Sequence, residues 1–71
     1  MSNEWKLFRK NGISEAREHV VGEDLAGVSV SDKDSECVKY PGGWIFRNPE
    51  NHDDQWYVNE TFMIENYVRV E

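Results

Sequence analysis

The chain has 71 residues, a net charge of −6 and one cysteine. This length fits one domain, and a single cysteine excludes the internal disulfides or the cysteine-rich zinc site that stabilise many small domains. The negative charge disfavours direct contact with nucleic-acid phosphates and favours a partner with a basic surface.

The sequence shows no targeting or membrane segment. Residues 1–12 contain no apolar run of the signal-peptide type, and no stretch approaches the roughly 18 apolar residues of a membrane span. Cys37 has no second cysteine to pair with, which is typical of proteins in a reducing compartment. We therefore expect a soluble protein of a reducing cytoplasm, without membrane contact.

The N-terminal half predicts three short strands. Residues 5–10 read as a strand, and the Asn-Gly pair at 11–12 is a strong turn signal after it. Residues 13–21 offer either a strand or a helical turn, and the two valines at 20–21 favour a strand at 15–20. Strict alternation predicts a further strand at 27–31, with its valines facing the core. The five polar residues at 32–36 predict a solvated loop.

The central stretch predicts a hairpin. Pro41 and the two glycines after it form a turn that leads into a strand at 44–47, and a second aromatic strand follows at 55–58. Residues 48–54 between them are polar and contain Pro49, so we expect a loop there.

The C-terminal residues predict a helix followed by an edge strand. Asn59 is a good N-cap, and Glu60 suits the positive end of the helix dipole. We expect the helix at about 59–67, and the alternating tail at 68–71 suggests pairing at the edge of a sheet.

Together these elements predict a β-rich α+β fold. We expect a small twisted antiparallel sheet or an SH3-like barrel of four or five short strands, with one short C-terminal helix over an open end. Exposed strand edges also allow a homodimer. The expected core is aromatic, because a domain of this size has little else to bury; it comprises Trp44, Phe46, Trp56 and Phe62.

Three stretches resemble a family of small proteins from tailed bacteriophages and prophages. Residues 22–34 match a GEDLxGxSVS pattern, residues 41–58 match GGxIxxNPxNxxDQWxV, and residues 62–67 match FxxxNY. The family also has an RPY-like segment before the first pattern, where this chain has Glu18 and His19. The resemblance implies a phage accessory protein made in the cytoplasm of a bacterial host, and it implies no particular activity.

No stretch carries a catalytic pattern, and we expect neither an enzyme nor a cofactor. Cys37 with His19 or His52 is a nucleophile–base pair in principle, but the acids beside Cys37 oppose thiolate formation. Residues 52–54 (His-Asp-Asp) carry metal-ligand types, yet neighbouring residues of an extended chain point to opposite sides. The default interpretation is a polar loop, and a small metal-dependent enzyme is the remote alternative.

The most acidic part of the chain is its last third, where residues 48–71 carry six acids and one base. We interpret it either as a solvated face or as a surface that docks on a basic host protein such as a defence or nucleic-acid-processing factor. Aromatic and arginine side chains suit the same role. The candidate partner-binding residues are Arg47, Glu50, Asp53, Asp54, Tyr57, Glu60 and Glu65. The competing hypothesis is a minor phage structural or assembly protein that self-associates.

Overall fold

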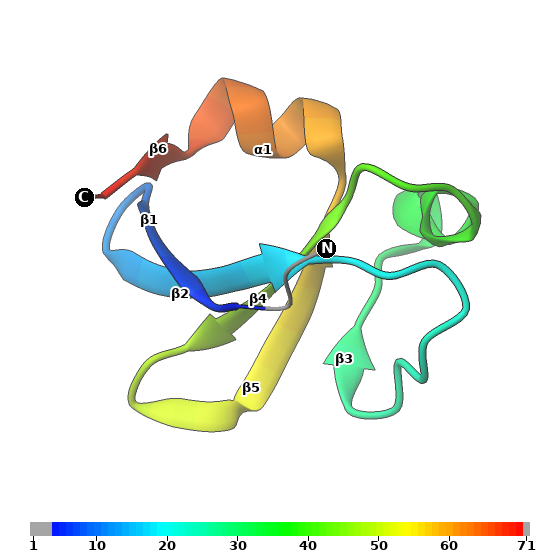
Figure 1. Cartoon of the computed structure of the whole chain (residues 1–71), viewed down its shortest axis with the longest axis horizontal. Helices are drawn as coiled ribbons and strands as arrows, with labels where there is room; N and C mark the ends of the chain where they lie inside the picture. The colour runs from blue at the N-terminus through cyan, green and yellow to red at the C-terminus, as the bar shows by residue number, and fades with distance from the viewer. Residues whose placement is uncertain (1–3, 71) are drawn as a thin grey trace.

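The computed structural model describes residues 4–70, which form one curled sheet, one α-helix and two short 3-10 helices (Figure 1). Helix α1 spans Glu60–Asn66, and η1 and η2 span Asp32–Asp34 and Cys37–Lys39. The six strands are β1 (Lys6–Arg9), β2 (Ile13–Glu18), β3 (Val28–Ser29), β4 (Trp44–Asn48), β5 (Asn51–Val58) and β6 (Val68–Arg69).

The strands lie in the order β3-β5-β4-β2-β1-β6. All neighbours are antiparallel except β3 and β5, which are parallel. The predicted β-rich α+β class is confirmed, with six strands in place of four or five and one parallel pair. The tail pairs with β1 through β6, as expected, although Glu71 lies outside the described residues.

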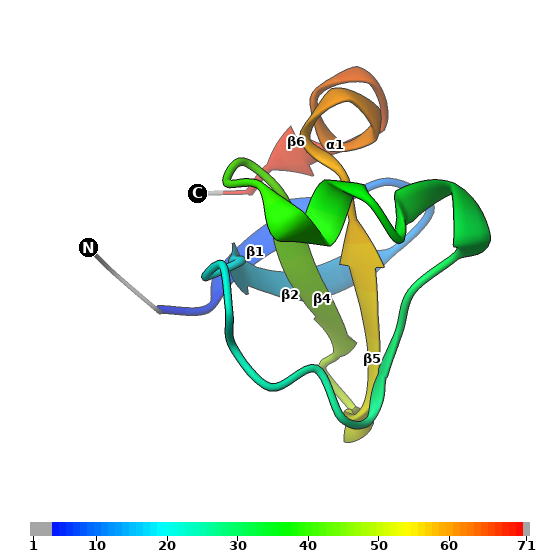
Figure 2. The same ribbon diagram turned by 90° about the vertical axis from the view of Figure 1, so that its right-hand side faces the viewer.

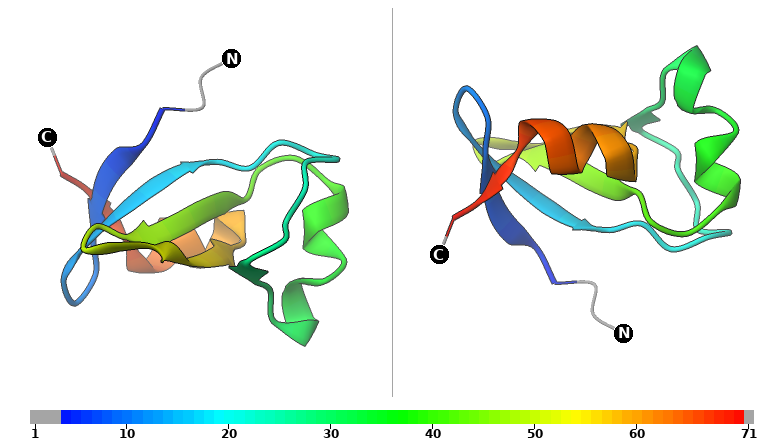
Figure 3. Two further views of the ribbon diagram at one scale, coloured as in Figure 1. Left: turned by 90° about the horizontal axis from the view of Figure 1, so that it is seen from below. Right: turned by 90° about the horizontal axis from the view of Figure 1, so that it is seen from above.

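One face of the sheet packs against α1 (Figure 3, right). Phe46 stands opposite Ala16 on one neighbouring strand and Trp56 on the other, and both Phe46 and Ala16 are fully buried. Alternation places Trp44 and Val58 on the same face. The core cluster consists of Phe8, Ala16, Phe46, Val58 and Met63, with Trp44, Trp56 and Tyr67 packed against it.

The expected burial of Phe62 is wrong. Its side chain is 43% exposed, and Met63 provides the buried contact from α1 instead. The side-chain oxygen of Asn59 accepts a hydrogen bond from the Phe62 amide at 2.8 Å, which confirms the predicted cap. This cap fixes where the helix begins, and the resulting helical phase points Met63, rather than Phe62, at the sheet.

The β4–β5 hairpin is tighter than predicted. Strand β5 already begins at Asn51, so most of the expected 48–54 loop is strand, and only two residues join the strands. Asn48 accepts a hydrogen bond from the Glu50 amide at 2.9 Å, and Asn51 accepts one from the Asp53 amide at 3.2 Å. These side-chain bonds, with a register shift after Arg47, accommodate the polar residues within the hairpin.

The opposite face of the sheet holds a second buried group. Ile45 is fully buried and lies between Arg17 and Tyr57 in the register. Tyr57 is 6% exposed and meets the His19 ring edge-on at 5.4 Å. The 19–43 segment, which carries β3, η1 and η2, lies beside β5 at this end of the sheet (Figure 2).

No helix within residues 4–70 is long and apolar enough to cross a membrane.

Candidate functional site

A groove of about 560 Å³ lies where the end of β2, the turn before β4 and the start of α1 meet. Strands β2 and β4 form its base, since Glu18 stands directly opposite Trp44 in the register. The groove is lined by Glu18, His19, Val20, Val21, Pro41, Gly42, Gly43, Trp44 and Glu60. Its volume lies within the usual range for ligand and side-chain pockets, about 300–1,000 Å³.

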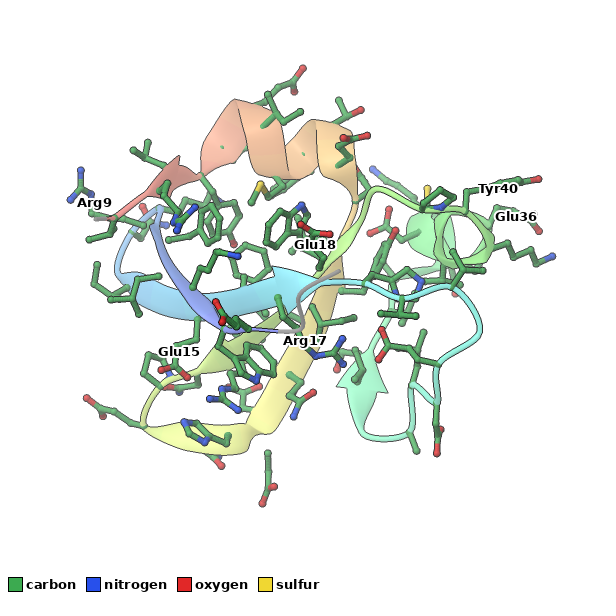
Figure 4. All side chains as sticks on the ribbon, in the orientation of Figure 1. Arg9, Glu15, Arg17, Glu18, Glu36 and Tyr40 are labelled. Atoms are coloured by element: carbon green, nitrogen blue, oxygen red, sulfur yellow. The ribbon has the colours of Figure 1, made fainter. Side chains whose placement is uncertain are left out.

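Two carboxylates give the groove its charge. Glu18 points to the side of β2 on which α1 lies, whereas Arg17 points to the other side (Figure 4). Glu60 stands at the N-terminus of α1 and lies over Gly42, where an added Cβ would come 2.9 Å from the Glu60 carboxylate. Neither carboxylate forms an ion pair with another residue of the described chain. With half-buried Trp44 in the same lining, the groove suits a cationic side chain.

A buried polar network holds one wall of this groove. The His19 side chain is 1% exposed, and its Nδ1 lies 2.9 Å from Oε2 of Glu23. Its Nε2 donates to the Val38 carbonyl at 2.9 Å. Arg17 donates to both oxygens of Glu23, at 3.1 and 2.7 Å, and the Val20 amide adds a bond of 2.9 Å.

The network keeps the Glu23 carboxylate ionised to lower pH than an ordinary glutamate. Burial alone would raise its pKa, but the hydrogen bonds from Arg17, Val20 and His19 outweigh burial and lower the pKa to about 2. In the described part of the chain, every buried side-chain nitrogen and oxygen has a partner. Through these bonds, His19 and Glu23 anchor the 19–43 segment to Arg17 in the sheet.

No protein-family model matches this chain, and no curated protein or solved structure matches it. Its candidate sites therefore rest on the geometry of its own residues.

The predicted acidic surface divides into two separate parts. Glu50, Asp53 and Asp54 are exposed around the tip of the β4–β5 hairpin. Glu60 and Glu65 lie on α1, at the opposite end of the molecule from that tip (Figure 1). The structure therefore does not bring these five acids into one face, and Glu60 is the one among them that lines the groove.

Two other candidates from the sequence lie in packed positions. Tyr57 was predicted as part of a binding surface, but it is buried, because its hydroxyl end packs over Gly43 beneath the 19–43 segment. Burial raises the pKa of the Tyr57 hydroxyl, and the nearby Cys37 and Asp34 raise it further. Arg47 is half-buried. Its side chain donates a hydrogen bond to the Glu15 carboxylate at 2.6 Å, and its guanidinium lies 3.9 Å from the centre of the Trp5 ring.

The catalytic alternatives find little geometric support. Cys37 forms no hydrogen bond with His19, whose two ring nitrogens face Glu23 and Val38. His52 lies at the other end of the sheet, with Nε2 3.4 Å from the Glu15 carboxylate. Among residues 4–70, no three histidine, cysteine, aspartate or glutamate side chains are grouped so that they could hold a metal ion.

The sequence did not single out Glu18 as a site residue. It was noted only because it stands where the resembled phage pattern has an RPY-like segment. The groove arises from the pairing of β2 with β4 and from the approach of α1, and both bring together residues distant in the chain.

Proposed function

We propose that this protein is a non-enzymatic phage accessory protein that binds a basic host protein in the host cytoplasm. The groove between β2, β4 and α1 is the docking site in this proposal. The observation that carries it is the pair of carboxylates, Glu18 and Glu60, that line one groove together with half-buried Trp44. A lysine or arginine side chain of the partner would meet both charges and the aromatic ring.

Two features of the sequence support the same proposal. The net charge of −6 would draw a basic partner toward the protein and speed association. The resemblance to phage proteins suggests a partner in the host, such as a defence or nucleic-acid-processing factor.

The test is an affinity pull-down of the tagged protein from bacterial lysate, at low and at moderate salt. We expect one stoichiometric basic protein that is lost as salt rises. The double variant Glu18→Gln/Glu60→Gln should bind the purified partner about tenfold more weakly, which corresponds to about 1.4 kcal/mol. The control is Glu65→Gln, which removes one negative charge from α1 at a position outside the groove. It should bind the partner as the wild type does.

A second double variant separates the groove from the hairpin tip. Charge reversal of Asp53 and Asp54 to lysine should slow association, because it reduces the overall field, but it should leave the dissociation rate unchanged. Faster dissociation in this variant, with normal dissociation of the groove variant, would place the docking surface at the hairpin tip. Full retention of the partner by the groove variant would contradict the proposed site.

Self-association remains the second candidate because apolar side chains are exposed on the sheet face opposite buried Phe8 and Ala16. Leu7, Ile13 and Val68 are 41%, 44% and 58% exposed on three adjacent strands. Strand β6 is also an open edge that a second copy could extend. Sedimentation equilibrium distinguishes the candidates: a concentration-dependent dimer, with recovery of the bait alone in the pull-down, would favour an assembly protein.

A further inference from the structure

A second cavity, of about 420 Å³, lies between α1, the end of β5, the η1 segment and the β1–β2 turn. The view in Figure 2 shows these four parts of the chain around one side of the molecule. The side chains that matter here are three aromatic rings and two lysines: Trp56, Phe62, Tyr67, Lys10 and Lys33. A neighbouring hollow of about 340 Å³ shares Lys10, Trp56 and Tyr67 with this cavity.

The aromatic rings are held from behind and are accessible from the cavity. The ring of Phe46, in the core, stacks on the Trp56 ring with 6.1 Å between their centroids. Its centroid lies 4.4 Å from that of the Tyr67 ring. Trp56 and Tyr67 are nevertheless only half-buried, and Phe62 is 43% exposed. Rings fixed in this way present flat apolar surfaces on which a planar ring can stack at little entropic cost.

The charge of this cavity is opposite to that of the whole protein. Lys10 and Lys33 line it together with one acid, Asp34. The two oxygens of Asp34 accept hydrogen bonds from Asn59 at 2.8 Å and from Ser31 at 3.2 Å. Neither lysine forms an ion pair with any residue from 4 to 70, and the Lys10 ammonium lies 5.2 Å over the Phe62 ring. The cavity can therefore accept a negative group.

We propose that this cavity binds a nucleoside monophosphate. The base stacks on Trp56 and Tyr67, and the phosphate lies between Lys10 and Lys33. A planar ring with one anionic group matches both features of the cavity, whereas an acidic peptide matches the charge alone. The net charge of −6 favours a single phosphate over a strand, because further phosphates would meet the acidic remainder of the surface.

The experiment is a titration of the full chain with adenosine monophosphate, adenosine and inorganic phosphate. The readout is the indole N–H signal of Trp56 in nitrogen-15 NMR spectra. We expect the nucleotide to shift this signal and to bind at least about fivefold more tightly than adenosine or phosphate alone. The variant Lys10→Gln/Lys33→Gln should bind the nucleotide at least about fivefold more weakly. Lys39→Gln, which changes an exposed lysine of η2, is the matched control and should bind normally.

Four results would overturn the proposal. The first is an unchanged Trp56 signal at millimolar nucleotide. The second is equal binding of phosphate and nucleotide, which would indicate an anion site without base stacking. The third is unchanged nucleotide binding by the double lysine variant. The fourth is tighter binding of a poly-glutamate peptide or an oligothymidylate than of the nucleotide, which would identify an acidic peptide or a single strand as the ligand. These outcomes do not depend on the groove at Glu18 and Glu60.

Discussion

Glu23 offers the most direct test of how the 19–43 segment is attached to the sheet. Its carboxylate accepts bonds from Arg17, His19 and the Val20 amide, and its pKa is lowered to about 2 from an ordinary value of 4.5. Each pKa unit corresponds to about 1.4 kcal/mol, so ionised Glu23 contributes about 3 kcal/mol to the free energy of unfolding. A domain of this size is expected to have only about 3–5 kcal/mol in total.

The sign of the pH dependence follows from the lowered pKa. The contribution is fully present above pH 4.5, where Glu23 is ionised in both the folded and the unfolded chain. It is lost as the pH falls from 4.5 toward 2, because the unfolded chain takes up the proton first. In Glu23→Gln this contribution is absent at every pH, and the NH2 group that replaces one carboxylate oxygen faces donors with which it cannot bond.

The assay is urea unfolding of the wild type and Glu23→Gln at several pH values from 2 to 7. We expect a gap in unfolding free energy of about 3 kcal/mol at neutral pH that narrows steadily below pH 4.5. The control is Glu36→Gln, because Glu36 forms an exposed pair with Lys39 at 3.3 Å; it should change stability by less than about 0.5 kcal/mol. A gap that stays constant with pH, or a Glu23 carboxyl that titrates near 4.5 by NMR, would refute this account of the network.

Two further substitutions test the packing around the 19–43 segment and α1. Gly43→Ala should destabilise the protein by more than about 2 kcal/mol, because its Cβ would overlap the Tyr57 ring, whereas Gly12→Ala has open space and should be nearly neutral in the same thermal-unfolding assay. Asn59→Ala should cost about 1–2 kcal/mol and lower the melting temperature by about 4–16 °C, because it removes the cap on Phe62; an unchanged melting temperature would show that the cap is dispensable.

The local sequence predicted the elements well, because each has a short-range physical cause. Alternation indicated the strand near 27–31 and the C-terminal tail, aromatic residues indicated β4 and the end of β5, and Asn59 marked the start of α1 correctly. The predicted turn before β4 is also present, with Gly42 at a φ of 113°. Phe46 lies in the core as expected, and Trp44, two residues earlier on the same face of the strand, is half-buried and packs against that core.

The errors arose where tertiary contacts decided the outcome. Tyr57 looked like a surface residue because alternation places it opposite the main core, but the 19–43 segment buries that face as well. The acids of the last third are close in sequence, yet the turn after β5 directs the helix away from the hairpin tip. The residues next to Glu18 and Lys33 in the sequence form no pattern that indicates a binding site. Each groove is assembled from segments that only the folded sheet brings together.

The direct pairing of β2 with β4 has a consequence for how this chain can vary. Glu18 and Trp44 are partners in the register, and the His19 amide donates to the Gly43 carbonyl at 2.9 Å, so the sheet itself joins the two ends of the 19–43 segment. A loop closed at its base can be lengthened at its exposed middle at a cost of only about 0.6 kcal/mol for each doubling. The exposed residues 35 and 36, between η1 and η2, are therefore the place to insert a peptide or a fluorescent label while both grooves keep their sheet framework.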